Sequence, residues 1–128
     1  MSISSEISRL SREVSQLERE KKQYIEIRNK LHIIETSINT GEKNINSAKT
    51  FLNDEYSGSK QVSKMNKKIE TIKGYHQEVK TLKNQFANDI NNKISNITYQ
   101  INRKKTRIRN LRAQLNLNSS NLNKEQVK

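Results

Sequence analysis

Apolar residues recur every three or four positions along two long segments of the chain, residues 3–52 and 62–115. The polar residues 53–59 separate the two segments. Spacing of this kind places apolar side chains on one face of an α-helix. Either helix alone would expose its apolar stripe, whereas a second helix running back along the first covers much of both. The pattern predicts an all-α fold, an elongated antiparallel two-helix hairpin of the coiled-coil type.

The same spacing sets the expected boundaries of the hairpin. We expect the first helix over residues 3–54, a turn over 55–60 and the second helix over 61–115. Residues 116–128 are rich in Asn and Ser and lack an apolar period. Such a composition is typical of disordered segments, so these residues are predicted to form a flexible polar tail after a hairpin over 1–115.

The apolar stripe of the first segment changes phase once, between Glu20 and Tyr24, and such a change moves the stripe around the helix. Residues 24–38 consequently carry apolar side chains on more than one face. One paired helix covers only one of those faces, so we interpret the excess as a surface that binds a partner protein. A two-sided core, created by a bend at Gly41, is the alternative interpretation. The predicted partner-binding surface comprises Tyr24, Ile25, Ile27, Leu31, Ile33 and Ile34.

The position of the turn sets the expected register of the hairpin, and with it the residues that the apolar stripe of the second segment faces. A turn centred between residues 57 and 58 makes the numbers of facing residues sum to about 115. Gly41 then faces Gly74, and glycine within a helix costs about 1 kcal/mol relative to alanine. The coincidence indicates closely approaching helices or kinks near both glycines, with chance or a helix end at Gly41 as alternatives. The stripe comprises Val62, Met65, Ile69, Ile72, His76, Val79, Leu82, Phe86, Ile90 and Ile94.

The composition agrees with a narrow apolar seam. Hydrophobic residues make up 30% of the chain, against roughly 45–50% in a typical domain counted with glycine. There is no proline to break a helix and no cysteine to form a disulfide or bind a metal. No apolar run approaches the about 20 residues of a membrane span, and the N-terminus lacks the pattern of a Sec signal peptide. We therefore expect a cytoplasmic protein that, if it is co-secreted, leaves without a cleavable signal peptide.

The net charge of +12 belongs entirely to the second half of the chain. Residues 1–58 hold nine basic and nine acidic side chains, whereas residues 59–128 hold sixteen basic and four acidic ones. A solvated helix end balanced in part by Glu6 and Glu13 is one interpretation, and a surface for an acidic protein face is another. Nucleic acid and a peripheral membrane contact are less favoured. The excess is densest at Arg103, Lys104, Lys105, Arg107, Arg109 and Arg112.

Residues that could perform chemistry are sparse. His32 and His76 are isolated from each other and from carboxylates at metal-ligand spacing, and His76 is interpreted as a histidine packed in the seam. Glycine-rich phosphate loops and Ser/His/Asp arrangements are absent from the sequence. The sequence thus predicts no catalytic residue, no metal site, no cofactor and no enzymatic activity.

The expected turn contains Tyr56-Ser57-Gly58, an aromatic-x-Gly triplet between two long helices. In this respect the chain resembles the WXG-like hairpins of type VII (ESX-like) secretion, and especially the helical accessory proteins associated with LXG-domain toxins. The resemblance covers about residues 3–115, with tyrosine in place of the signature tryptophan. It implies binding to the N-terminal helical domain of a toxin, help in targeting that toxin for export, and a second small helical hairpin protein as another candidate partner. Tyr56 and Gly58 are then candidate partner-binding residues, and packing of the turn onto the end of the hairpin is the alternative role of Tyr56.

Two other functions remain open from the sequence. A self-associating structural coiled coil, a homo-oligomer, would also cover the apolar stripes. A basic protein that binds nucleic acid or a membrane surface would use residues 103–112, and its affinity would fall steeply with salt.

Overall fold

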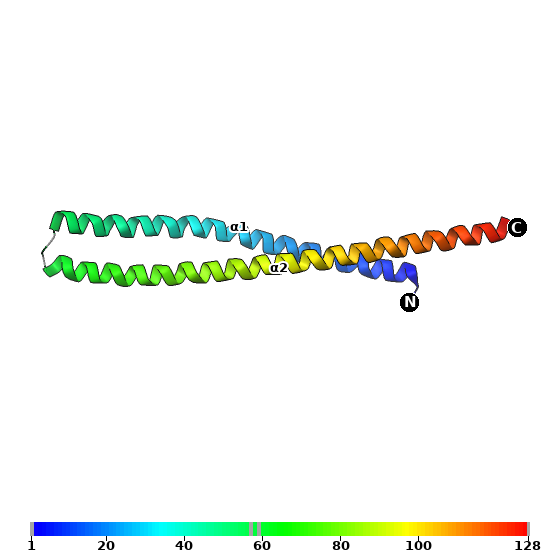
Figure 1. Cartoon of the computed structure of the whole chain (residues 1–128), viewed down its shortest axis with the longest axis horizontal. Helices are drawn as coiled ribbons and strands as arrows, with labels where there is room; N and C mark the ends of the chain where they lie inside the picture. The colour runs from blue at the N-terminus through cyan, green and yellow to red at the C-terminus, as the bar shows by residue number, and fades with distance from the viewer. Residues whose placement is uncertain (1, 57, 59, 128) are drawn as a thin grey trace. The chain divides into compact units, whose positions relative to one another are not determined.

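The computed structural model contains two α-helices joined by a short turn (Figure 1). Helix α1 spans Ile3–Tyr56 and helix α2 spans Lys60–Val127. The structure describes residues 2–56, 58 and 60–127, and the side chains of residues 55, 56 and 123–127 lie outside this description. The described residues form no strand, and the helices pack against each other in antiparallel fashion. The prediction of an all-α helical hairpin is confirmed.

Helix α1 begins at the expected residue 3 and the helix ends at the turn lie within two residues of the expected ones, whereas α2 ends later than expected. Helix α1 is capped by Ser2, whose Oγ accepts a hydrogen bond of 3.1 Å from the backbone amide of Ser5. Gly58 lies in the turn with a φ of 92°, a left-handed conformation that suits glycine. Helix α2 continues to Val127, whereas the sequence predicts its end at residue 115 and a flexible tail beyond. No glycine or proline occurs over 116–127, and the moderate helix propensity of Asn and Ser does not stop a helix that is already formed.

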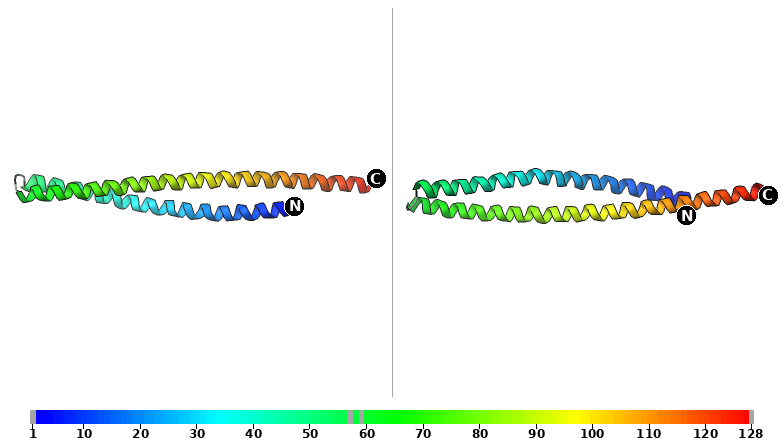
Figure 2. Two further views of the ribbon diagram at one scale, coloured as in Figure 1. Left: turned by 90° about the horizontal axis from the view of Figure 1, so that it is seen from below. Right: turned by 45° about the horizontal axis from the view of Figure 1, so that its top comes forward.

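The chain divides into two compact units, each containing a piece of both helices. We call Met1–Glu26 with Asn92–Lys128 the terminal unit, and Ile27–Asn91 the turn unit. Within the turn unit, the antiparallel course of α1 and α2 can be followed in the views of Figures 1 and 2. Each unit has its own seam between the helices, and the two seams differ in chemistry.

The seam of the terminal unit is apolar. The half-buried Lys21 occupies the position between Leu17 and Tyr24, so the alternation of three and four residues continues. The predicted phase change near Glu20 is therefore wrong. A lysine fits such a position because its methylene stem packs on apolar surface while its ammonium group reaches water. The buried core comprises Leu10, Val14, Ile97, Ile101, Ile108 and Leu111, against which Ile3, Ile7, Leu17 and Tyr24 pack.

The seam of the turn unit alternates apolar and charged residues. On α1 it includes Leu31, Glu35, Ile38, Glu42, Ile45, Lys49 and Leu52. On α2 it includes Val62, Asn66, Ile69, Lys73, His76, Lys80, Lys83, Ala87 and Ile90. Five apolar residues of α2 that the sequence analysis places in the seam are instead exposed, so that part of the prediction is wrong. They are Met65, Ile72, Val79, Leu82 and Phe86.

The ion pairs between the helices show the register, which lies close to the predicted one. Lys83 Nζ lies 3.6 Å from Glu35 Oε1 in the turn unit, and Lys104 Nζ lies 2.7 Å from Glu13 Oε2 in the terminal unit. The residue numbers of these pairs sum to 118 and 117, two to three residues from the expected 115, and the sums of the other ion pairs between the helices in the described part of the chain lie between 113 and 123. In this register Ile3, the first residue of α1, faces the neighbourhood of residue 115. The segment 116–127 of α2 thus extends past the start of α1, as Figure 1 shows.

The predicted contact between mirrored glycines is absent. Helix α1 runs without interruption through Gly41, and α2 through Gly74, so Gly41 does not end a helix. A Cβ atom added at Gly41 would lie 3.0 Å from Cε1 of His76, whereas one added at Gly74 would meet nothing within 4 Å. Gly41 therefore permits the close approach of a histidine, and Gly74 faces open space.

Candidate partner-binding surfaces

The predicted partner-binding residues of α1 have different environments. Leu31 is only 9% exposed because it belongs to the seam of the turn unit, so it is not part of an accessible surface. Tyr24 is half-buried against the core of the terminal unit, and Ile25 is half-buried in the same unit. The interpretation as surface residues needs correction for Leu31 and for much of Tyr24, because both pack within the hairpin. For Ile25 it stays a prediction.

The other apolar residues of that prediction are exposed in the turn unit. Ile33 is 69% exposed, and Ile27 and Ile34 are exposed to a lesser extent. Tyr56 is the last residue of α1, but its side chain lies outside the described residues, as does Ser57. Gly58 is exposed in the turn. The turn unit thus presents part of the predicted surface on α1.

A larger apolar surface lies on α2, where the sequence analysis did not place one. Its six side chains are between 49% and 64% exposed. Four of them follow one another at intervals of seven residues, and the other two are also seven residues apart, the period of a coiled-coil stripe. We call this surface the α2 stripe. It comprises Met65, Ile72, Tyr75, Val79, Leu82 and Phe86.

The two sides of the turn unit differ in polarity. Each helix has two rows of residues that border the seam, one on each side of the helix pair. In an antiparallel pair, the residues that directly precede one set of seam positions on both helices share one side, and the residues that directly follow the other set share the opposite side. Grooves on the latter side are lined by Asn53 with Ser63 and Glu70, and by His32 with Asn91. We call it the polar side. The opposite side, which we call the apolar side, carries Ile27, Ile34, Gly41 and Ala48 of α1 and Met65, Ile72, Val79 and Phe86 of α2.

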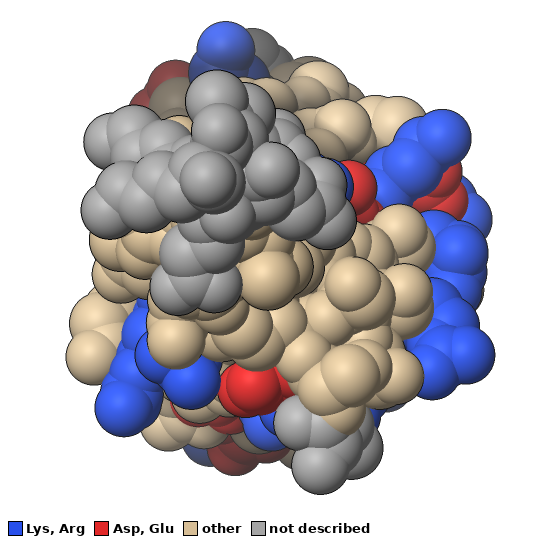
Figure 3. Space-filling view, turned by 90° about the vertical axis from the view of Figure 1, so that its right-hand side faces the viewer, with Lys and Arg blue, Asp and Glu red and all other residues tan. Residues whose placement is uncertain are grey.

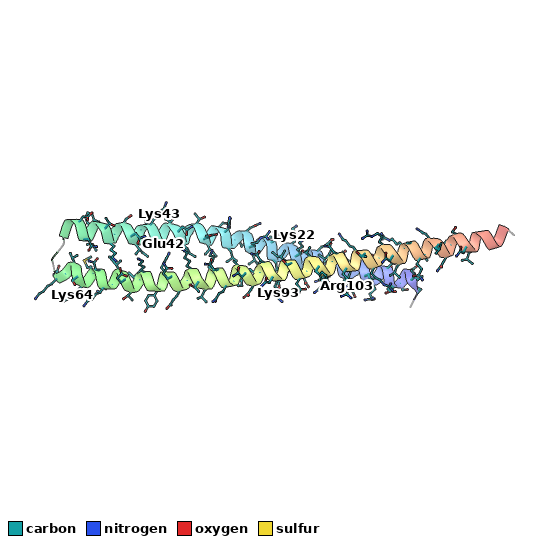
Figure 4. The ribbon with its side chains drawn as sticks, in the orientation of Figure 1. Lys22, Glu42, Lys43, Lys64, Lys93 and Arg103 are labelled. Carbon is teal, nitrogen blue, oxygen red and sulfur yellow. The ribbon has the colours of Figure 1, made fainter. Side chains whose placement is uncertain are left out.

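Ion pairs give the seam of the turn unit its register. Glu42 Oε2 lies 3.4 Å from Lys80 Nζ, and Lys49 Nζ donates a hydrogen bond to Glu70 Oε1. That hydrogen bond lowers the pKa of Glu70, and the positive charge of Lys49 contributes to the same shift. Figure 4 shows Glu42 on the face of α1 toward α2 and Lys43 on the opposite face. Solvent-exposed pairs of this kind contribute little stability, so the turn unit is held together less strongly than the apolar terminal unit.

Residues 103–112, the predicted basic patch, lie on α2 in the terminal unit. Lys105 Nζ lies 3.1 Å from Glu18 Oε1, and Arg107 Nη2 lies 3.6 Å from Glu6 Oε1. Together with Lys104 and Glu13, these pairs confirm that carboxylates of the first helix balance part of the patch.

The hydrogen bond from Lys104 is the main cause that lowers the pKa of Glu13; desolvation opposes it, and a hydrogen bond from Arg9 adds to it. Among the described residues, no carboxylate lies within 4 Å of Arg103, Arg109 or Arg112. In the end view of Figure 3, red carboxylates stand among the blue basic side chains. The patch is therefore a mixed charged surface with three uncompensated arginines.

Metal-binding chemistry has no evident site in the described part of the chain, where no three His, Cys, Asp or Glu side chains converge. Within the same residues, neither helix contains a segment long and apolar enough to cross a membrane. Comparison of the chain with protein-family models, with curated proteins and with solved structures finds no match.

Proposed function

We propose that this protein is a non-enzymatic binding partner of the N-terminal helical domain of an LXG-type toxin, which it helps target for export by type VII secretion. The observation that supports this proposal best is the α2 stripe, because a seven-residue apolar period is suited to packing against another helix. Full burial of such a side chain contributes about 1.5–3 kcal/mol, so covering half-exposed ones contributes about 1 kcal/mol each. Six of them contribute about 6 kcal/mol, which offsets a large part of the about 4–15 kcal/mol that association costs.

The toxin is chosen as partner because of the turn. Gly58 lies in the turn in a left-handed conformation. It follows the long helix α1, whose last residue is the aromatic Tyr56. An aromatic-x-Gly turn between two helices is the pattern of WXG-like hairpins. A helical cargo domain would cover the α2 stripe and complete a helical bundle.

Co-expression with the N-terminal domain of an LXG-type toxin encoded beside this chain tests the proposal. We expect the two proteins to copurify, and light scattering to give the mass of a hetero-complex. The matched control is an unrelated LXG domain from a distant locus, which should bind less. If the neighbouring toxin domain elutes separately at micromolar concentrations of both proteins, the proposal is rejected.

Self-association is the second candidate, and the same exposed stripe supports it, since two copies could cover each other's stripes. Sedimentation of the isolated chain over a hundredfold concentration range separates the two functions. A binding partner for a toxin remains monomeric until the toxin domain is added, whereas a structural coiled coil forms homo-oligomers alone.

A further inference from the structure

We infer that the apolar side of the turn unit receives one amphipathic helix from a partner protein, with apolar residues at heptad spacing and acidic residues beside the first turns of α2. This inference rests on the proposed function and deepens it, because it assigns the docking surface and the charge of the occupant.

The shape of the apolar side is suited to a third helix. Its α1 row contains the small residue Ala48, whereas its α2 row contains the larger Met65, Ile72 and Phe86. A helix laid along this side can approach α1 closely at Ala48 and pack its side chains against the large ones. Tyr75 and Leu82, farther around α2, lie where they would cover the outer edge of that helix. The polar side of the same unit offers no comparable apolar row.

The charges near the turn favour an acidic occupant. Four lysines fall within the first nine residues of α2, and no acidic residue occupies its first turn. A helix N-terminus carries a partial positive charge, so lysines there are unfavourable unless anions are close. Among the described residues, no carboxylate lies within 4 Å of these four. Figure 4 shows one of them, Lys64, on the face of α2 away from α1. They are Lys60, Lys64, Lys67 and Lys68. Lys60 and Lys67 line the groove on the polar side, so the two lysines available to an occupant of the apolar side are Lys64 and Lys68.

The same charges disfavour a second copy as the occupant. Residues 27–91 contain eleven basic and seven acidic side chains, so two turn units brought together would repel each other. A partner helix rich in Glu and Asp is attracted instead, and its carboxylates would increase the association rate and select it over neutral helices. Charge therefore decides between two occupants that the apolar surface alone would accept equally.

The test uses two synthetic 28-residue helices of identical Leu/Ile heptads, one flanked by Glu and the other by Lys, both verified as monomers. Binding to the full chain is measured by fluorescence anisotropy. We expect the acidic peptide to bind at least tenfold more tightly than the basic one. The double substitution Ile72→Ser and Val79→Ser should weaken that binding at least tenfold. Lys64→Glu with Lys68→Glu should weaken it further at low salt.

Matched controls keep the test specific. Gln77→Ser with Asn84→Ser makes two serine substitutions on the polar side of the same helix and should leave binding unchanged. Lys60→Glu with Lys67→Glu makes the same change of charge in the same turns of α2, but on the polar side. Circular dichroism verifies that each variant remains helical.

Equal binding of both peptides, or equal losses for the apolar-side and polar-side variants, would overturn the inference. So would a homodimer of the chain that Ile72→Ser with Val79→Ser abolishes, because the occupant would then be a second copy. The proposed function has a separate outcome. If the toxin domain binds but ignores the apolar-side variants, only the surface assignment fails; if the acidic peptide binds at this surface and the toxin domain does not, only the choice of toxin fails.

Discussion

Two glycines at helical positions allow a sharp test of the helix register. In an exposed helix interior, Gly→Ala is expected to stabilise the fold by about 1 kcal/mol because alanine has the higher helix propensity. Gly74→Ala should show the whole of this gain, because its new Cβ would meet nothing within 4 Å. Gly41→Ala gains the same propensity, but its Cβ would lie 3.0 Å from Cε1 of His76. That distance is well inside the ordinary carbon contact of about 3.5–4.0 Å.

The collision at Gly41 displaces a histidine that is hydrogen-bonded. His76 Nε2 lies 2.8 Å from the backbone oxygen of Ile38, and such a bond contributes about 0.5–1.5 kcal/mol. Losing it offsets the propensity gain, so Gly41→Ala should change the stability by no more than about 0.5 kcal/mol in either direction. The two substitutions are thus predicted to differ by about 0.5–1.5 kcal/mol although their local chemistry is identical.

Urea unfolding followed by circular dichroism at 222 nm measures this difference. In a background of His76→Ala the obstacle is removed, and Gly41→Ala should then stabilise about as much as Gly74→Ala. Equal stabilisation by both glycine substitutions in the wild-type background would refute the contact between Gly41 and His76, and with it the register of the turn unit.

Three further predictions concern the seams and the pH dependence. Leu111→Ala should destabilise the protein by about 2–5 kcal/mol and Ile72→Ala by less than about 1 kcal/mol, both measured by urea unfolding, since only the first is buried. Because the pKa of Glu13 is lowered in the folded state, its contribution to the stability of the fold is present above about pH 4.5 and is lost as the pH falls through the folded pKa. Glu13→Gln should therefore flatten the loss of stability on acidification. An unchanged pH profile would contradict the pairing of Glu13 with Lys104. Truncation after Leu115 should leave the melting temperature of the remaining helices within about 2 °C, whereas a larger drop would show that residues 116–127 stabilise the hairpin.

The terminal unit was largely predictable from the sequence. Its seam positions, such as Leu10, Val14 and Ile101, are apolar on both helices. The apolar spacing of each helix therefore identifies the residues that face the other helix. The phase change expected near Glu20 was an error of a simple kind, because Lys21 was not counted as a residue that can occupy a seam. The extension of α2 past residue 115 was missed because composition was taken as evidence against a helix that nothing interrupts.

The turn unit could not be predicted in the same way, because α2 carries two stripes with the same period there. One runs through Met65, Ile72 and Val79, and the other through Ile69, His76 and Lys83. Apolar periodicity alone favours the first, and the sequence analysis placed it in the seam together with Ile69 and His76, in place of the row Asn66, Lys73 and Lys80. A signal for the second was present in both helices: glutamates of α1 at intervals of seven face lysines of α2. Complementarity between the helices, rather than the apolar content of either, identifies the seam.

Electrostatics explains why α2 turns its more apolar stripe away from α1. The α1 seam presents Glu35, Glu42 and Lys49 at intervals of seven residues. Rotating α2 so that its apolar stripe faced this row would bury those charges against apolar side chains and separate them from Lys80 and Lys83. Such a rotation would break three ion pairs across this seam at once and partly desolvate their charged groups without partners, which is unfavourable. The ion-paired seam therefore fixes the rotation of α2 and leaves its apolar stripe exposed, and this stripe can be covered only by a helix from outside the hairpin.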